Sequence, residues 1–570
     1  MFTINLTQMT QKGFFGHPAG LFTLFFTEMW ERFSYYGMRA ILILFMLTKL
    51  TEKNAGMGLD EATAGAIYGL YTASVYLLTL PGGWLADNIF GQRKAIWYGG
   101  IIIMIGHLSL AVPTDSMFYI GLGLVALGTG LLKANISTIV GDLYPEGGSR
   151  RDAGFSIYYM GINLGSIVGQ MIVGYLGEKV NWHYGFGAAA VGMFLGLVVY
   201  KLTEKSYLGD IGVQPKAKEK DVVQSGNGSS GFVWTLVLLF AVFISALHFT
   251  KVIDLSTATG IAGAMKYVIV SIAALYFAYV LIAGGLTAEE KKKVYVIICL
   301  FIGASLFWSG FEQAGSTLNM FSIRHTFRNF GPLEGMSYLP SILGWLVFIA
   351  LTFVWSWYVF KRKDLLPELK VIIGLVILGV SYFAKWITTN IVMGWEMPAS
   401  WLQSINPLFI VIFAPFFANL WLSLGSRNIY PSAPLKFGVG LVLLGLGFLV
   451  MVFASEVVVA GLPEESRVAA TWLLMTYFLH TAGELTLSPV GLSMTTKLAP
   501  KKFAGQMMGI WFIAAALGNL IAGIFAGNFD ENNVAEMPNL FMSVVMFAVG
   551  SGILFMVFSG RIKKLMGEVK

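Results

Sequence analysis

The sequence predicts an all-α polytopic membrane protein with about sixteen spans. Its 570 residues are 56% hydrophobic and only 12% charged, with a mean hydropathy of +0.71, whereas soluble domains contain about 25% charged residues. Apolar runs of about 20 residues, each long enough to cross a bilayer, follow one another along the chain. The single cysteine, Cys299, is incompatible with a disulfide framework or a cysteine-based metal site. The basic residues lie in short loops rather than in one patch with stacking aromatics, so no nucleic-acid partner is expected.

Six of these runs predict an N-terminal half over residues 15–203. They lie at 21–50, 61–86, 95–113, 118–140, 153–178 and 182–203. Residues 204–231 contain lysines, glycines and serines in place of apolar side chains, so we expect a flexible cytoplasmic linker there. An extra helix pair is predicted next, at 232–286.

A C-terminal half is predicted to begin with a long helix at 293–321 and to continue with five helices over 403–560. These five lie at 403–424, 436–454, 467–497, 503–527 and 538–560. A second extra pair, 341–389, separates the long helix from them and is expected to be peripheral. Two six-helix halves that meet at a midplane site are the arrangement expected of many secondary transporters.

The charges in the loops predict the orientation of the chain. Cytoplasmic loops carry an excess of Lys and Arg. With a cytoplasmic N-terminus, the loops that contain Arg93, Arg150 and Lys361 lie inside, whereas the loops that contain Glu396 and Asp530 lie outside. This alternation requires both extra pairs to span fully, and it places both termini in the cytoplasm.

One face of the first predicted helix is polar. At about 100° per residue, a narrow stripe is formed by Glu28, Glu31, Arg32, Tyr35, Tyr36 and Arg39. The opposite face offers Phe25, Leu42 and Met46 to lipid or protein. A charge at mid-bilayer costs at least about 2.5–3.5 kcal/mol on insertion scales, so these charges must face a wet cavity or one another. A soluble amphipathic helix is the alternative, but the rest of the chain is equally apolar, and the stripe therefore predicts a polar pathway.

Several motifs carry a resemblance to one family. The 82–94 loop resembles the major facilitator signature Gly-x-x-x-Asp-x-x-Gly-x-x-Arg, matched by Gly83, Asp87, Gly91 and Lys94 with Arg93 adjacent. The polar stripe reads Glu28-Met-Trp-Glu31-Arg32-Phe-Ser-Tyr35-Tyr36-Gly37 and resembles the Glu-x-x-Glu-Arg-Phe-x-Tyr-Tyr-Gly motif of the proton-dependent oligopeptide transporter (POT/PTR) family. Two further family signatures follow at 155–166 and 483–491, and 130–135 also matches. The resemblance covers about 15–560 and implies a major facilitator fold of two six-helix halves, to which the extra helix pairs are additions.

Some features depart from the common pattern of that family. The pair 232–286 is similar to one found in bacterial members, whereas 341–389 is not expected from the family pattern and leaves Lys385 without an assigned role. Position 69, where animal members carry a histidine, is Gly69, so proton coupling by that route is not expected. No long domain precedes the helix at 467–497, unlike in animal members, which favours a multi-pass protein of the bacterial inner membrane.

The resemblance implies proton-coupled symport of di- and tripeptides by alternating access, with the proton as coupling ion and no cofactor. Glu28, Glu31 and Arg32 are the proton-coupling candidates, with a static ion-pair lattice as the alternative. The substrate-binding candidates are Arg39, Tyr35, Tyr36, Tyr71, Lys133, Asn163, Trp308, Asn406, Glu484 and Trp511. A guanidinium binds a carboxylate bidentately, which suits Arg39 to the peptide carboxylate, while Glu484 suits the ammonium. The resemblance also implies the gating salt bridges Arg39–Glu312 and Lys133–Glu484.

The sequence is also compatible with other functions. The same fold can carry another amino-bearing or anionic small solute. An intramembrane hydrolase would need a catalytic group, and neither His-Glu-x-x-His nor a Ser/His/Asp set is visible in the spans. A passive channel would not need a proton-sensitive stripe. His107 and His480 match no family site and receive no role here. The expected partners are peptides and the lipid bilayer, and a monomer is expected to suffice for transport.

Overall fold

The computed structural model describes residues 13–567, with gaps at 147, 216–244, 246–247, 251–253, 330–343, 347, 351, 354–355, 358–360, 362–366, 393–395, 428, 462–466 and 531–532. The helices of the first half are α1 (Gly20–Leu47), α2 (Glu61–Leu77), α3 (Thr79–Leu85), η1 (Ala86–Phe90), α4 (Gln92–Leu110), α5 (Asp115–Asp142), α6 (Gly148–Tyr175), η2 (Leu176–Val180) and α7 (Trp182–Leu208). Those that follow are α10 (Ala258–Ala283), α11 (Ala288–Phe311), η3 (Glu312–Gly315), α12 (Thr317–His325), α14 (Pro367–Val392), η4 (Ala399–Ser404), α15 (Ile405–Ser426), α16 (Ala433–Ala460), α17 (Thr471–Leu498), η5 (Lys501–Phe503), α18 (Ala504–Ala526), η6 (Val534–Glu536) and α19 (Met537–Met566).

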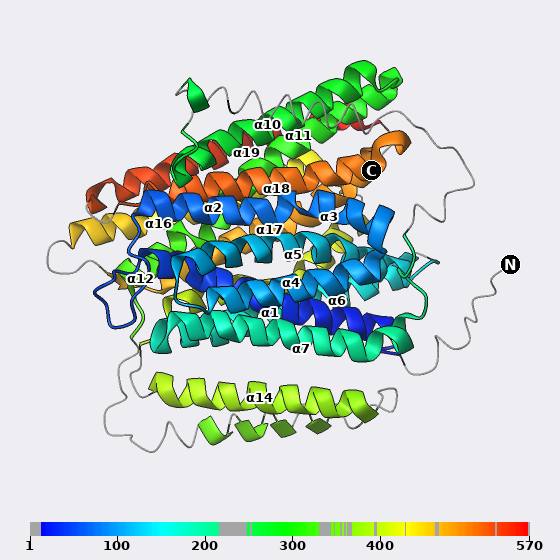
Figure 1. The fold of residues 1–570 in the computed structure, drawn as a ribbon. Helices are drawn as coiled ribbons and strands as arrows, with labels where there is room; N and C mark the ends of the chain where they lie inside the picture. Colours follow the sequence, from blue (N-terminus) through cyan, green and yellow to red (C-terminus); the bar gives the residue numbers. More distant parts are fainter. Residues whose placement is uncertain are drawn as a thin grey trace.

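The long helices run side by side as one bundle (Figure 1). We call the end at which α1 begins and α7 ends the inner end, and the end at which α1 ends and α2 begins the outer end. In the first half α1 packs on α6 and α7, and α4 packs on α5. In the second half α16 packs on α17 and α19, and α11 packs on α18. Among the described residues, ten helices are long and apolar enough to cross a membrane.

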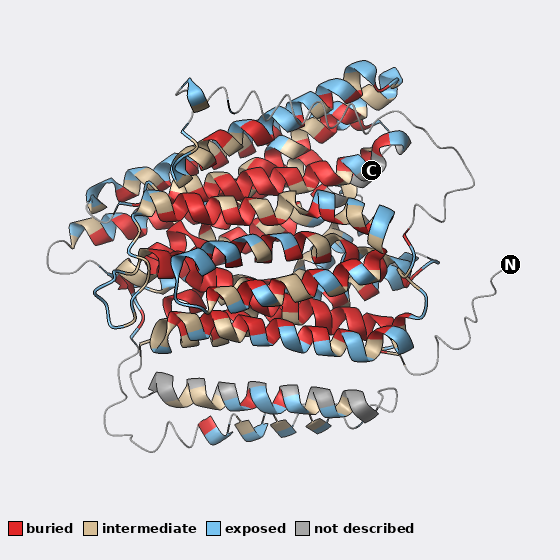
Figure 2. Ribbon diagram, viewed as in Figure 1, coloured by how far each residue is buried: buried red, intermediate tan, exposed pale blue. Residues whose placement is uncertain are grey.

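The polar helix α1 lies in the interior of the first half. Almost every residue of α1 is buried (Figure 2), including Phe25, Leu42 and Met46 on the face opposite the charges. That face contacts protein, so the option that it meets lipid is wrong. Because α1 carries four charges, it is not among the ten apolar helices, and it is held in the bundle by the α6 and α7 surfaces around it.

Several expected helices differ from the observed ones. The expected helix at 61–86 is broken into α2 and α3, followed by the π-helical segment η1. The long helix expected at 293–321 ends at Phe311, and the 3₁₀ segment η3 separates it from α12. Helix α7 continues to Leu208, into the expected 204–231 linker.

The count of about sixteen spans remains a prediction. Much of the first helix of each extra pair, at 232–250 and 341–360, lies outside the described residues. The second helices of these pairs are described as α10 and α14.

Two short strands were not expected from an all-α prediction. Strand β1 (Thr326–Phe327) follows α12, and β2 (Val468–Ala469) precedes α17. They pair in parallel, with Thr326 opposite Val468. Each strand has two residues, so neither shows the alternation of apolar and polar side chains by which strands are recognised in a sequence.

The second extra pair lies at the edge of the bundle. Helix α14 runs along the outside of the bundle (Figure 1). Its Trp386 ring contacts Tyr175, at the end of α6, and Trp401, in η4. The Lys385 ammonium lies 4.0 Å from the centroid of the Trp345 ring, so this cation rests on an aromatic face of the same helix pair.

Glycines bring the two halves into close contact where α2 meets α18. A methyl group at Gly523 would collide with the backbone of Gly69, and a Cβ at Gly69 would lie 3.0 Å from the Leu520 carbonyl oxygen. Any side chain at position 69 would therefore press on the α18 backbone. The glycine at this position is explained by packing between the halves.

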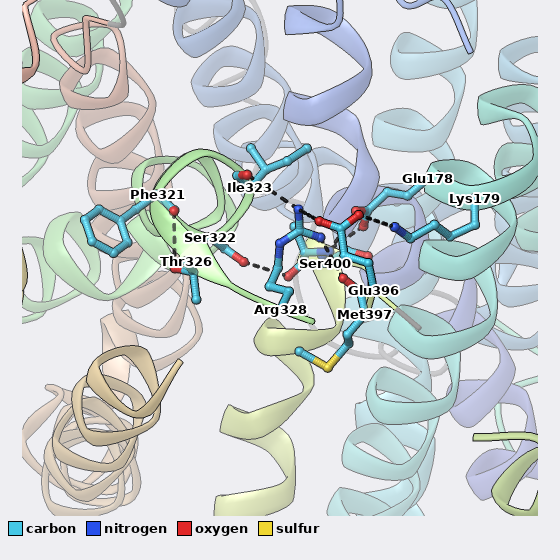
Figure 3. A network of polar contacts seen from close by, with 11 residues as sticks. Glu178, Lys179, Phe321, Ser322, Ile323, Thr326, Arg328, Glu396, Met397 and Ser400 are labelled. Atoms are coloured by element: carbon cyan, nitrogen blue, oxygen red, sulfur yellow. Dashed lines mark hydrogen bonds and ion pairs between the residues drawn. The ribbon is translucent and has the colours of Figure 1, made fainter. Parts of the chain in front are cut away.

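A polar network joins the halves at the outer end (Figure 3). The Glu178 carboxylate in η2 accepts hydrogen bonds from the backbone N–H groups of Ala399 (2.7 Å) and Ser400 (2.9 Å) in η4. Glu396 pairs with Lys179 (Nζ to Oε2, 3.0 Å) and with Arg328 (Nη2 to Oε1, 2.9 Å). We refer to Glu178, Lys179, Arg328 and Glu396 with the 397–400 backbone as the outer network. These contacts hold the outer ends of the two halves together.

Candidate functional site

Three charges of the α1 stripe, Glu28, Glu31 and Arg32, form one ion-paired group. The Arg32 Nε atom lies 2.7 Å from Glu28 Oε1 and 3.0 Å from Glu31 Oε2, and all three side chains are buried. Glu28 Oε2 and Glu31 Oε1 accept no hydrogen bond from the described residues. A buried carboxylate oxygen without a hydrogen-bond donor is unfavourable. Binding of a proton to that oxygen would neutralise the carboxylate. Two carboxylates around one guanidinium form a group that can exist with or without an added proton.

The break in the seventh helix places a carboxylate against α1. Glu312 follows directly on α11, as the first residue of η3. It forms an ion pair with Arg39, whose Nε also donates to the Tyr68 hydroxyl at 2.6 Å. Arg39 and Glu312 are both buried. The expected Arg39–Glu312 salt bridge between the halves is therefore present in this structure.

The second expected salt bridge is not formed here. The Lys133 ammonium lies 3.8 Å from the centroid of the Tyr76 ring, and in the described part of the structure no ion pair joins it to Glu484. Glu484 Oε2 instead accepts a hydrogen bond from Asn406 Nδ2 at 3.3 Å. Lys133 and Glu484 are thus charges without an ionic partner among the described residues.

Asn406 and Asn163 are held differently. Asn406 Nδ2 also donates to Thr481 Oγ1 at 2.9 Å, so this amide links α15 to α17 in the second half. Asn163 Nδ2 donates to the Tyr159 carbonyl oxygen of its own helix at 2.9 Å. The amide oxygen of Asn163 is not engaged in that bond, which leaves an acceptor on the first-half side of the site.

These residues surround one cavity of about 260 Å³ between the halves. The lining contains the expected residues Glu28, Arg32, Tyr36, Arg39, Lys133, Asn163, Trp308, Glu312, Asn406 and Glu484. It does not contain the expected residues Glu31, Tyr35, Tyr71 and Trp511. The lining combines charged, amide and aromatic groups, as expected of a pocket that orients a small polar ligand.

The three expected aromatic residues outside the lining pack against other parts of the protein. The buried Tyr35 ring lies against Tyr36 and Tyr71, with ring centroids 5.1 and 6.5 Å away. Trp511 packs against Gly491 and Phe437. In an apolar helix, sequence alone does not separate an aromatic side chain that lines a cavity from one that packs behind it.

Some lining residues were missed by the sequence analysis. They are Tyr76, Ser137, Tyr159, Ile162, Ser166, Gln170, Phe311, Ala314, Gly315, Gln403, Pro407, Ile410, Tyr477 and His480. His480 was given no role, yet it lies four residues before Glu484 on the same helical face and reaches the cavity. The same spacing rule would have added Tyr477, which lies seven residues before Glu484.

Metal chemistry has no visible support within the described residues. No group of three or more His, Cys, Asp or Glu side chains there is arranged to hold a metal ion. The chemistry that this arrangement offers is charge pairing, hydrogen bonding and proton uptake by carboxylates.

Comparisons with known proteins agree on one family. A family model described as the POT family matches residues 93–389 and 381–542. An uncharacterized transporter of Bacillus subtilis, YclF, is 39% identical over 99% of this chain and 98% of its own length. The peptide transporter YePEPT of Yersinia enterocolitica is 35% identical, over 98% of this chain and 97% of its own. A di-/tripeptide transporter of Lactococcus lactis is 34% identical, over 98% and 99%.

Solved structures show the same relationship. A crystal structure of a peptide transporter POT in complex with sulfate has a TM-score of 0.76 and 36% sequence identity, and the match covers 99% of this chain and 100% of that one. A POT family transporter in complex with 5-aminolevulinic acid has a TM-score of 0.74 and 31% identity, with 98% and 99% covered.

Proposed function

Since the chain belongs to the POT family of transporters, we propose that it is a proton-coupled symporter of di- and tripeptides that works by alternating access. It is a secondary transporter rather than an enzyme. Two relatives similar to it along their whole length are named as transporters of peptides.

The arrangement of charges in the cavity is the main support for a peptide substrate. Lys133 on the first-half side and Glu484 on the second-half side form no ion pair within the described residues, whereas the other lining carboxylates are paired with arginines. A buried charge without a partner is unfavourable. A zwitterionic peptide would supply a carboxylate to the cationic side, formed by Lys133 and Arg39, and an ammonium to Glu484.

Such a cavity suits a ligand with variable side chains. The charged ends are common to all peptides, and they meet fixed charged groups. Trp308, Phe311 and Ile410 add apolar surface without a defined shape requirement. Charged groups at fixed positions set the orientation, while apolar surface tolerates different side chains.

Uptake into proteoliposomes tests the proposal directly. Purified protein is reconstituted, labelled dialanine is added outside, and an inward proton gradient is imposed or omitted. We expect accumulation above the outside concentration only with the gradient. Accumulation that follows an imposed sodium gradient and not a proton gradient would refute proton symport, and release of free alanine without uptake would indicate hydrolysis.

We further propose that the inner end faces the cytoplasm of a bacterial cell and that the protein resides in the inner (plasma) membrane. Arg93, Arg150 and Lys291 lie in the first turns of α4, α6 and α11, at the inner end, whereas Glu396 and Asp530 lie in loops at the outer end. This distribution follows the positive-inside rule and leaves both termini in the cytoplasm. The transport cavity is lined by residues of a single chain, which supports the proposal that a monomer suffices for transport.

The contacts between the halves support assigning the structure to a state that is closed at the outer end. Arg39 and Glu312 lie in the outer half of the bundle and are paired, as are Arg324 and Glu61 at 2.8 Å. Lys133, in the inner half of α5, is not paired with Glu484. Transport by alternating access requires the outer contacts to open and the inner contacts to close in turn.

A second candidate substrate is a small solute with an amino group and a carboxylate. The structural relative bound to 5-aminolevulinic acid favours this alternative. That ligand has the same two end groups as a peptide but no peptide bond. Competition of unlabelled 5-aminolevulinic acid with labelled dialanine separates the two, because a peptide-specific site is not inhibited by it at equal concentration.

A further inference from the structure

We propose that the inner ends of α4 and α7 form a binding site for the headgroup of an anionic phospholipid. A cavity of about 480 Å³ lies between these two helix ends and the segment that follows α7. It is separate from the transport cavity, with which it shares no lining residue.

Basic side chains dominate the cavity. Arg93 and Lys94 come from α4, Lys201 and Lys205 come from α7, and the carboxylates are Glu204 and Asp210. Glu204 is buried and pairs with both Arg93 (3.1 Å) and Lys201 (3.0 Å). The four cations therefore outnumber the two carboxylates, which favours an anion.

Two of the lysines that line the cavity are exposed to solvent. Lys94 and Lys205 are exposed, and neither forms an ion pair with a described residue. Helix α4 begins at Gln92 without a side-chain cap, so the partial positive charge of its N-terminus adds to theirs. Phosphate oxygens are suitable acceptors for the two ammonium groups.

The floor of the cavity is preformed. The Arg93 guanidinium donates to the Gly209 carbonyl oxygen at 2.6 Å, and the Arg93 backbone N–H donates to Gly212 at 2.9 Å. These bonds fix the chain after α7 over the start of α4. The Trp97 ring stacks on Tyr200. The Lys201 ammonium lies 4.9 Å from the centroid of the Trp97 ring. Tryptophan and tyrosine are enriched at the headgroup level of membranes.

Exposed apolar residues continue from the lysines toward the middle of the bundle, and they identify the anion as a lipid. On α4, Tyr98 and Ile105 follow Lys94 at spacings of one and three helical turns. On α7, Val198 and Phe194 lie seven and eleven residues before Lys205 on the same face. Acyl chains of a lipid held at the lysines would lie along these exposed residues. A free phosphate would gain nothing from them.

The test is lipid binding to the purified full-length protein in detergent, followed by native mass spectrometry. Dioleoyl phosphatidylglycerol and dioleoyl phosphatidylcholine are titrated separately. We expect preferential binding of phosphatidylglycerol, and we expect Lys94→Gln/Lys205→Gln to lower that affinity about 30-fold, because each lysine near an anionic lipid contributes about 1 kcal/mol. Phosphatidylcholine binding should not change.

Matched variants and a competitor make the outcome decisive. Lys563→Gln/Lys564→Gln removes two exposed lysines at the inner end of α19 and should leave phosphatidylglycerol binding unchanged. Lys94→Arg/Lys205→Arg keeps both positive charges and should retain phosphatidylglycerol binding. This variant distinguishes the effect of lost charge from the effect of disturbed folding. Equal affinity of Lys94→Gln/Lys205→Gln and Lys563→Gln/Lys564→Gln for phosphatidylglycerol would overturn the proposed site. Displacement of the lipid by excess inorganic phosphate would show a site for soluble anions and would also overturn the proposal.

Discussion

Glu178 at the outer end of the first half accepts a hydrogen bond from the backbone N–H group of Ser400 in the second half, over 2.9 Å. A second N–H group, of Ala399, donates to the same carboxylate at 2.7 Å. A negative charge at the start of a helical segment is favourable because the first N–H groups there have no partner within the segment. One side chain thus connects the two halves at the outer end, where they must part during transport.

Glu178→Ala should therefore favour opening at the outer end. The variant leaves two N–H groups of η4 without their acceptor, at a cost of about 1–3 kcal/mol for each group that stays buried. The measurement is the labelling rate of Ser166→Cys, a cavity residue, by a membrane-impermeant maleimide added outside, in a Cys299→Ser background. We expect an increase of about tenfold or more, which corresponds to about 1.4 kcal/mol. Glu52→Ala, which removes an exposed carboxylate at the same end, is the control and should change nothing.

Arg39→Ala should impair both folding stability and peptide binding. Removing one partner of a buried charge pair costs about 2–5 kcal/mol, largely because the other charge stays buried alone. That charge is Glu312, so Arg39→Ala/Glu312→Gln should have a higher melting temperature than Arg39→Ala. Peptide binding should stay weak in both variants, as measured by competition with labelled dialanine.

The unmodified protein offers a second check on Arg39. Dialanine amide lacks the carboxylate and should compete poorly. If the amide and the free acid compete equally, Arg39 does not bind the peptide carboxylate. Arg561→Ala, which removes an exposed arginine of α19, is the matched control and should retain binding.

Gly69→Ala should destabilise the protein, although alanine is a better helix former than glycine by about 1 kcal/mol. The added methyl group would press on the α18 backbone at Leu520 and Gly523, and overpacking costs about 1–3 kcal/mol. Gly263→Ala, in α10 with open space around it, is the matched control and should raise the melting temperature or leave it unchanged. Gly69→His should have a larger effect than Gly69→Ala, and a stable, active Gly69→His protein would contradict this packing argument.

The main features of the fold could be predicted because they depend on length and apolarity. Two helical halves, a polar stripe on the first helix and a partner for Arg39 at Glu312 all follow from residue spacing or from motif resemblance. The breaks at η1 and η3 could not be predicted, since the apolar pattern continues through them. Where a helix stops inside an apolar run depends on packing against neighbours rather than on the run itself.

The site was predictable in its charges and less so in its aromatics. Glu28 and Glu484 reach the cavity as expected, because a charge within the bundle must face polar surroundings. Tyr35 and Trp511 do not, because an aromatic ring is equally stable in the packing behind a cavity. The outer network was invisible to sequence analysis, since it joins Glu178 to backbone groups more than two hundred residues away.

Glu396, in the outer network, should not contribute to the pH dependence of transport near neutrality. Burial raises the pKa of Glu396, but the hydrogen bond from Lys179 and the charge of Arg328 outweigh this and hold the pKa below its usual value. Because this pKa is lowered, the ionised Glu396 carboxylate stabilises the folded protein fully at pH values above its pKa in the unfolded chain, about 4.3. The stabilisation is lost only as the pH falls through the lower pKa of the folded protein. Glu396→Gln should therefore label faster in the maleimide assay at every pH near neutrality. Its uptake should keep the pH profile of the unmodified protein, and a shifted profile would show that Glu396 titrates during transport.

Glu31→Gln should abolish proton-driven accumulation while preserving exchange. Glu31 lies behind the cavity lining, with its carboxylate 3.0 Å from the Arg32 Nε atom, and neither of its oxygens accepts a hydrogen bond from the described residues. The amide keeps the size of the side chain but cannot bind and release a proton. Accumulation requires that change in each cycle, because the empty carrier must return in a different protonation state from the loaded one. Counterflow, in which internal unlabelled peptide exchanges for external labelled peptide, requires only that the loaded carrier changes sides.

Both assays on one Glu31→Gln preparation decide the role of this residue. Glu28→Gln should show the same pattern more weakly, because Glu28 shares the Arg32 guanidinium with Glu31. Glu146→Gln, which changes an exposed carboxylate at the inner end, should behave as the unmodified protein in both assays. Loss of counterflow together with accumulation would assign Glu31 to holding the Arg32 side chain in place. Retention of both would place proton binding elsewhere, with Glu484 as the next carboxylate to test, since it lines the cavity without an ionic partner among the described residues.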